Sequence, residues 1–204
     1  RDLSTYLALA PANRPPTLRL TADISSSESI TISQNTTIDL AGYKLYYRVP
    51  KNDTDTFIKV ASGALTIEDS AKKLNKLHDE TTTVNENNPG QPATVEWGGD
   101  NYGTPISLTY YVTTSKPNAD GLGTTETTKQ HVVSGFGAIV AASDSGSVKQ
   151  VISVQGGSTL NLTGGMITTP CTLGNSGHVI LSQGAVNISG GYVTNGNGGG
   201  WGGG

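Results

Sequence analysis

The sequence predicts an all-β protein, and more closely a right-handed parallel β-helix, on three observations. Hydrophobic residues make up 34% of the 204 residues, charged residues make up 14%, and there are 27 glycines. Glycine and the abundant threonine disfavour long helices and suit short strands joined by tight turns. The second observation is the alternation of apolar and polar residues with a period of two. The third is a motif that recurs about every 26 residues.

The motif is clearest near the C-terminus, where residues 159–167 return as residues 185–193. Residues 65–67 are an earlier copy, and residues 38–40 lie about 27 residues before them. A coil of this size cannot bury its apolar face alone, so the coils are expected to stack. The residues predicted to share one continuous core are Leu40, Leu65, Ile67, Leu160, Leu162, Val186 and Ile188.

Two other folds are less consistent with this motif. A leucine-rich repeat has a similar period, but it needs a Leu-x-x-Leu-x-Leu pattern, whereas here Gly-Gly follows the strand. A β-sandwich would not predict the same ordered motif at a fixed offset. The parallel β-helix is therefore the favoured prediction.

The repeat divides the chain into four expected segments. Residues 1–34 form an N-terminal cap with a short helix at 5–10, which Pro11 ends, and the first coil. Residues 35–71 and 149–204 form regular coils, the last of which is expected to continue beyond the chain end. Residues 72–148 break the period and are interpreted as an inserted excursion, with a strand pair at 104–114 and a return to the coil at 137–141. Insertions of this kind often lie on the binding face.

The excursion also carries the candidate ligand-binding residues. Flat aromatic rings on a rigid scaffold can stack on sugars, and polar loop groups beside them can form hydrogen bonds. The alternative is that the rings form a small core of the excursion itself. The candidate residues are Trp97, Asp100, Asn101, Tyr102, Tyr110 and Tyr111.

No catalytic residues, metal site or cofactor are predicted. A glycoside hydrolase needs two carboxylates across the scissile bond, and a calcium-dependent lyase needs an acidic cluster with a base. The acidic residues here are scattered over separate turns, and His178 is interpreted as a turn histidine. His78 and His131 lack partners at zinc spacing. Cys171 is expected to be a small buried core residue.

Charge and hydropathy bear on the partners. The net charge is −3 without a Lys/Arg cluster, so neither nucleic acid nor an anionic membrane is expected as a partner. No apolar run approaches the ~20 residues that span a bilayer, so no membrane insertion is expected. Low charge with many Thr, Asn and Gly residues predicts a secreted or cell-surface location.

Residues 36–45, residues 65–70 and the Leu-x-Leu-x-Gly-Gly-x-Ile unit at 160–167 carry a resemblance. They resemble the pectate-lyase-like β-helix repeats of large surface and adhesin-like proteins of Gram-positive gut bacteria. The resemblance covers roughly residues 17–70 and 135–204. It implies a long secreted or wall-attached stalk.

The expected function is therefore an extracellular structural and binding module of a bacterial surface protein, a stalk or adhesin-like module that binds a glycan or a host surface protein. A carbohydrate-active enzyme, either a polysaccharide lyase or a glycoside hydrolase, is the first alternative. A self-assembling filament subunit is the second. It follows from the C-terminal coil, which lacks a polar cap, so its open strand edges are expected to allow head-to-tail self-association.

Overall fold

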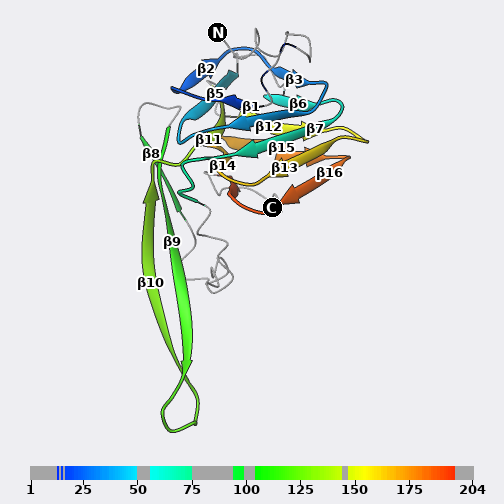
Figure 1. Cartoon of the computed structure of the whole chain (residues 1–204). Coiled ribbons are helices and arrows are strands. Elements are labelled where there is room, and N and C mark those ends of the chain that lie inside the picture. The colour runs from blue at the N-terminus through cyan, green and yellow to red at the C-terminus, as the bar shows by residue number, and fades with distance from the viewer. Residues whose placement is uncertain are drawn as a thin grey trace.

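A computed structural model of the chain describes residues 13, 15, 17–49, 56–74, 94–98, 104–143 and 147–195. Within these residues the strands form four sheets, of which three are parallel and one is antiparallel. Figure 1 shows the parallel sheets gathered in one body, from which a long two-stranded arm projects. We call this projection the arm.

The chain enters the three parallel sheets in turn as it advances, so strands distant in sequence become neighbours. Sheet A contains β1 (Thr17–Arg19), β4 (Thr36–Asp39), β7 (Ala64–Glu68), β13 (Thr159–Leu162) and β16 (Ala185–Ile188). Sheet B contains β2 (Ile24–Ser26), β5 (Lys44–Val49), β11 (Ala138–Ser143), β14 (Met166–Thr169) and β17 (Tyr192–Asn195). Sheet C contains β3 (Ile30–Ile32), β6 (Ile58–Val60), β12 (Ser147–Val154) and β15 (Thr172–Ser182).

The alternation of side chains explains why these segments form half-buried strands. In β3 and β6 the outer residues of each triplet are buried and the middle one is exposed. Parallel pairing then stacks like on like, since Ile30, Ile58, Ile152 and Ile180 are successive partners across sheet C. Each strand therefore contributes one isoleucine to a continuous inward row, which is buried at Ile30, Ile58 and Ile152 and partly buried at Ile180, and β-branched residues suit such a surface.

The inner faces of all three parallel sheets pack on a single apolar core. The core prediction is confirmed for five of its residues, Leu40, Leu65, Ile67, Leu160 and Leu162, which are fully buried there. Val186 is only partly buried against this core, and Ile188 is 51% exposed. These two lie on β16, which is the outermost strand of sheet A and is covered on one edge only.

The strand pairing predicted from the repeat is confirmed between β13 and β16, but the alignment predicted between β4 and β7 needs correction. Leu160 pairs with Val186, and the Asn187 amide donates a hydrogen bond to the Asn161 side chain 26 residues away. In contrast, Ile38 pairs with Ile67 and Thr36 with Leu65, which shifts the predicted alignment by two residues. A shift of two preserves the inward face, so the apolar pattern alone does not distinguish the two registers.

The predicted fold class, a right-handed parallel β-helix with about 26 residues per coil and an N-terminal capping helix, is wrong. The strands divide among four separate sheets, none of which is closed or solenoid-like, and one of them is antiparallel. The described residues contain no α-helix, and the helix expected at 5–10 lies outside them. The reason is that ladder hydrogen bonds pair strands within each sheet, and the excursion pairs with itself as a hairpin. No helix able to span a bilayer is found within the described residues.

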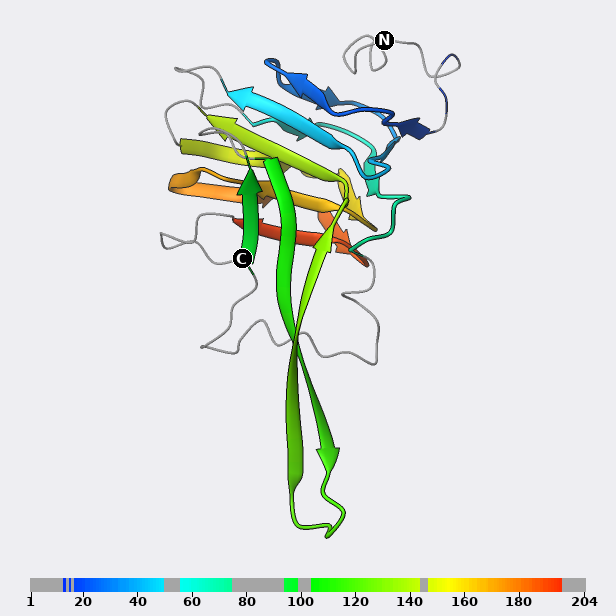
Figure 2. The same cartoon turned by 90° about the vertical axis from the view of Figure 1, so that its left-hand side faces the viewer.

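The antiparallel sheet, sheet D, consists of β8 (Thr94–Gly98), β9 (Thr104–Pro117) and β10 (Thr124–Ser134), in the order β10-β9-β8. The strand pair expected at 104–114 is instead one long strand, β9, whose partner β10 follows it in sequence. Figure 2 shows these two strands leaving the body together and ending far from it. The division of the chain into the four expected segments stays a prediction, although β7 and β13, on either side of the excursion, are direct neighbours in sheet A.

Candidate functional site

The root of the arm is buried in an apolar cluster on the outer face of sheet B. Leu108 and Tyr110 of β9 pack there with Ala138, Val140 and Met166. The other members are Leu74 and Phe136, with the partly buried Tyr46, Val95, Trp97, Val133 and Tyr192 against them. A two-stranded ribbon is marginally stable in water by itself, and this burial supplies the apolar contacts that fix its root.

The Asp69 carboxylate joins the two ends of the excursion. Its Oδ2 accepts a hydrogen bond from the Gly137 backbone N–H, 2.7 Å away and 68 residues later in the chain. Its Oδ1 accepts hydrogen bonds from the backbone N–H groups of Gly42 at 2.7 Å and Ala71 at 3.2 Å. Because Asp69 is only 3% exposed, these charge-assisted hydrogen bonds replace the water that a carboxylate otherwise needs.

Lys44 fastens the same region from β5. Its Nζ donates hydrogen bonds to the carbonyl oxygens of Phe136 and Gly42, and it lies 5.0 Å from the centre of the Phe136 ring. Burial lowers the pKa of the Lys44 ammonium, and the charges of Asp23 and Asp69 partly oppose this shift. Lys44 and Asp69 together hold the segment that leads from β10 into β11, so the arm is fixed to the body.

Beyond its root the arm is a polar, exposed hairpin. β8 pairs with β9 only as far as Thr109, whereas β10 pairs with β9 from Ser134↔Ser107 to Thr124↔Pro117. All of β10 except Val133 is exposed. Eight residues of β9, from Tyr110 to Pro117, extend past β8, which corresponds to about 27 Å of strand.

The tip of the arm, which we define as residues 118–123, is an ordered turn. The Asn118 N–H donates to the Gly123 carbonyl at 2.9 Å, and the Gly121 N–H donates to the Asn118 carbonyl at 3.0 Å. The Leu122 N–H donates to Asp120 Oδ1 at 3.0 Å. Gly121 and Gly123 have φ of 72° and 125°, values that favour glycine. This turn presents Leu122 with 85% of its surface exposed.

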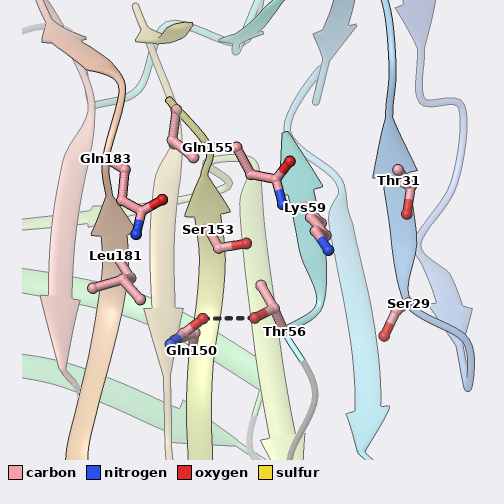
Figure 3. A pocket seen from close by; sticks show the side chains of 10 residues that line it. Ser29, Thr31, Thr56, Lys59, Gln150, Ser153, Gln155, Leu181 and Gln183 are labelled. Atoms are coloured by element: carbon pink, nitrogen blue, oxygen red, sulfur yellow. Dashed lines mark hydrogen bonds between the residues drawn. The ribbon is translucent and has the colours of Figure 1, made fainter. Parts of the chain in front are cut away.

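A groove of about 420 Å³ crosses the outer face of sheet C. Figure 3 shows the side chains that project into it from β3, β6, β12 and β15. One outward row consists of Thr31, Lys59, Ser153 and Leu181, which are successive strand partners. The remaining lining residues are Ser29, Thr56, Gln150, Val154, Gln155 and Gln183.

Lys59 is the only charged side chain among the described residues that line this groove. It forms no ion pair within the described part of the chain. Leu181, at the β15 side, is 37% exposed. The Gln150 side chain is held by a 2.7 Å hydrogen bond from Thr56 Oγ1 to its Oε1. The groove therefore combines amides, hydroxyls, one cation and one exposed apolar side chain.

The predicted ligand-binding residues are divided by the structure. Trp97 and Tyr110 lie in the apolar cluster at the arm root, and Tyr110 is 7% exposed and stacks on His131 with 5.2 Å between ring centres. Tyr111 is half-buried in β9. Asp100, Asn101 and Tyr102 lie outside the described residues. Ligand binding by this set stays a prediction, and two of its rings serve as core under the arm.

Other residues with chemical potential are dispersed. His178 lies half-buried in β15 beside Gln150, and its Nδ1 has no hydrogen-bond partner within the described residues. Cys171 is buried as predicted, and its Sγ accepts a hydrogen bond from the Ser143 N–H at 3.2 Å. No three His, Cys, Asp or Glu side chains among the described residues form a group that could hold a metal ion.

Sequence reasoning missed both the tip and the groove. The tip does carry a signal, because Asn118, Asp120, Gly121 and Gly123 are turn-forming residues between two threonine-rich runs. The groove has no local signal, since Thr31 and Leu181 become neighbours of the same row only through pairing in sheet C.

Comparison with known proteins finds no match among protein families, curated proteins or solved structures. The resemblance to pectate-lyase-like surface repeats therefore rests on the sequence motifs alone.

Proposed function

We propose that the protein is an extracellular structural and binding module, in which the body of parallel sheets presents the arm to another macromolecule. One observation supports this best: β10 of the arm and Leu122 at its tip are exposed, while the root of the arm is buried and fastened by Asp69 and Lys44. An arm that is already held in one orientation loses little conformational entropy on binding. The extracellular location rests on composition and on the sequence resemblance.

The arm suits contact more than catalysis or packing. Its strands carry Thr, Lys and His side chains such as Thr125, Lys129 and His131 in exposed positions. Apart from Val133, β10 is exposed, so this strand adds little apolar burial to the body. Connecting segments that are held out by a rigid scaffold commonly carry the binding function.

A binding array tests the proposal. The labelled full chain is applied to immobilised glycans, extracellular proteins and the chain itself, beside a variant in which Asn-Gly replaces residues 113–128. This replacement joins Val112 to Lys129, which are partners across the hairpin, with a sequence suited to a two-residue turn. Circular dichroism and thermal unfolding verify that the body of the variant remains folded.

The expected result is that the full chain binds at least one spotted ligand and that the shortened variant does not. As a matched control, Lys73→Glu reverses an exposed charge that lies outside the arm strands and the tip, and it leaves binding unchanged. Equal binding by the full chain and the shortened variant, or no binding by the full chain, contradicts the proposal.

A further inference from the structure

The tip of the arm and the groove on sheet C have complementary chemistry. The tip presents a carboxylate, Asp120, and a leucine, Leu122, that is almost fully exposed. The groove presents an ammonium, Lys59, and an exposed leucine, Leu181, and no carboxylate occurs among its described lining residues. The tip therefore offers one acidic and one apolar group, and the groove offers one basic and one apolar group.

The spacing of these groups also agrees. Lys59 and Leu181 lie in the same outward row, with Ser153 between them, so they are two strand spacings or about 9.6 Å apart. Asp120 and Leu122 are separated by one residue in the turn, which places their Cα atoms within about 7 Å of each other. The side chains extend this span, and the flexible stem of Lys59 adjusts it further. Both contacts can be made at the same time.

The contact requires two molecules. Figures 1 and 2 show the end of the arm far below the body, whereas the groove lies on sheet C of the body itself. The buried root prevents the arm from folding back, since Asp69 and Lys44 hold the segment at its base. The tip of one molecule can therefore reach only the groove of another.

We propose that the partner of the arm is a second copy of this chain, whose sheet C groove receives the tip through Asp120–Lys59 and Leu122–Leu181 contacts. This inference rests on the proposed function and names its partner. A contact in which one tip enters one groove is heterologous, and it leaves one groove and one tip free for further molecules. Association therefore propagates into chains of molecules as the concentration rises.

The backbone of the tip is already held in one conformation before any contact forms. Its backbone is held by the Asn118–Gly123 and Gly121–Asn118 hydrogen bonds, and Asp120 Oδ1 fixes the Leu122 N–H. Around the groove, Gln155 and Gln183 add amide groups that can donate to or accept from the backbone of the incoming turn. Preorganisation on both sides lowers the entropic cost of binding.

Sedimentation and light scattering over a concentration series measure self-association of the native chain and of variants in which the charges of the tip and the groove are reversed. Asp120→Lys and Lys59→Glu each place like charges together, which weakens association more than about tenfold. Leu122→Ser also weakens it, while Lys73→Glu serves as the charge-reversal control with native association. An equimolar mixture of Asp120→Lys and Lys59→Glu regains association, because each tip then meets a groove of opposite charge. Recovery on mixing also shows that the two variants are folded.

Three results would overturn this inference. The first is a native chain that stays monomeric at millimolar concentration. The second is association that neither charge reversal weakens. The third is association that Ile188→Lys abolishes and the charge exchange does not affect, which would place the contact at the open edge of β16. If the array shows arm-dependent binding to other ligands while the chain does not associate with itself, the binding function stands and only the self-partner is refuted.

Discussion

Replacing Asp69 with asparagine is expected to loosen the root of the arm. The substitution keeps the size of the side chain and one oxygen, but an NH₂ group takes the place of Oδ2, which accepts from the Gly137 N–H. The buried N–H then loses its acceptor, at a cost of about 1–3 kcal/mol. The hydrogen bonds from Gly42 and Ala71 lose their charge assistance, at about 0.5–1 kcal/mol each. The free energy of unfolding should fall by about 2–5 kcal/mol in total.

Urea unfolding followed by circular dichroism measures this change, which corresponds to a decrease in Tm of about 4–20 °C. Hydrogen exchange should show the Gly137 amide losing protection before the amides of sheet A. Glu68→Gln is the matched control, because it removes a neighbouring carboxylate that lies half-buried in β7. An asparagine variant that unfolds within about 0.5 kcal/mol of the parent and keeps the Gly137 amide protected would refute the role of Asp69.

Three further predictions concern the body and the arm. Leu162→Ala should lower the free energy of unfolding by about 2–5 kcal/mol, because the Leu162 side chain is fully buried. Ile188→Ala in the same row should lower it by about 1 kcal/mol, because Ile188 is half-exposed. Equal losses in urea unfolding would contradict this difference in burial. Gly121→Ala should cost about 1 kcal/mol, and Gly191→Ala should cost more than twice as much. Both glycines have a positive φ, but only a Cβ on Gly191 meets a backbone oxygen, that of Gly165 at 2.5 Å. Thermal unfolding of the two variants tests this order. Burial raises the pKa of Tyr110, so its contribution to stability is present below pH ~10, where the unfolded chain ionises, and is lost as the pH rises further. Tyr110→Phe should therefore reduce the alkaline loss of stability, and a variant whose stability falls with pH as steeply as the parent's would contradict this.

Much of the body could be predicted from the chain itself. The period-two alternation identified the inward residues Leu65, Ile67, Leu160 and Leu162, because side chains on a strand alternate between two faces whatever the partner strand. The recurrence of residues 159–167 at 185–193 predicted the pairing of β13 with β16, since similar strands stack without unpaired polar groups. The same reasoning placed Ile38 two residues out of register, because both alignments bury the same face.

The candidate site was less accessible to sequence reasoning. Trp97 and Tyr110 have the composition of a sugar-binding surface, but they lie under the arm root because Met166 and Ala138 of sheet B give them an apolar face to cover. The groove residues Lys59 and Leu181 occupy ordinary outward positions, and only pairing through Ser153 brings them into one row.

The sequence by itself determined that the body consists of short strands and which residues of most of these strands face inward. These are local properties, set by side-chain alternation and by the high content of glycine and threonine. Only the tertiary structure decided that the strands form separate sheets, that the excursion stands out as a hairpin and that Asp69 fastens its base. These features depend on contacts between residues as far apart as Asp69 and Gly137, and a long-range pairing leaves no periodic trace in the chain.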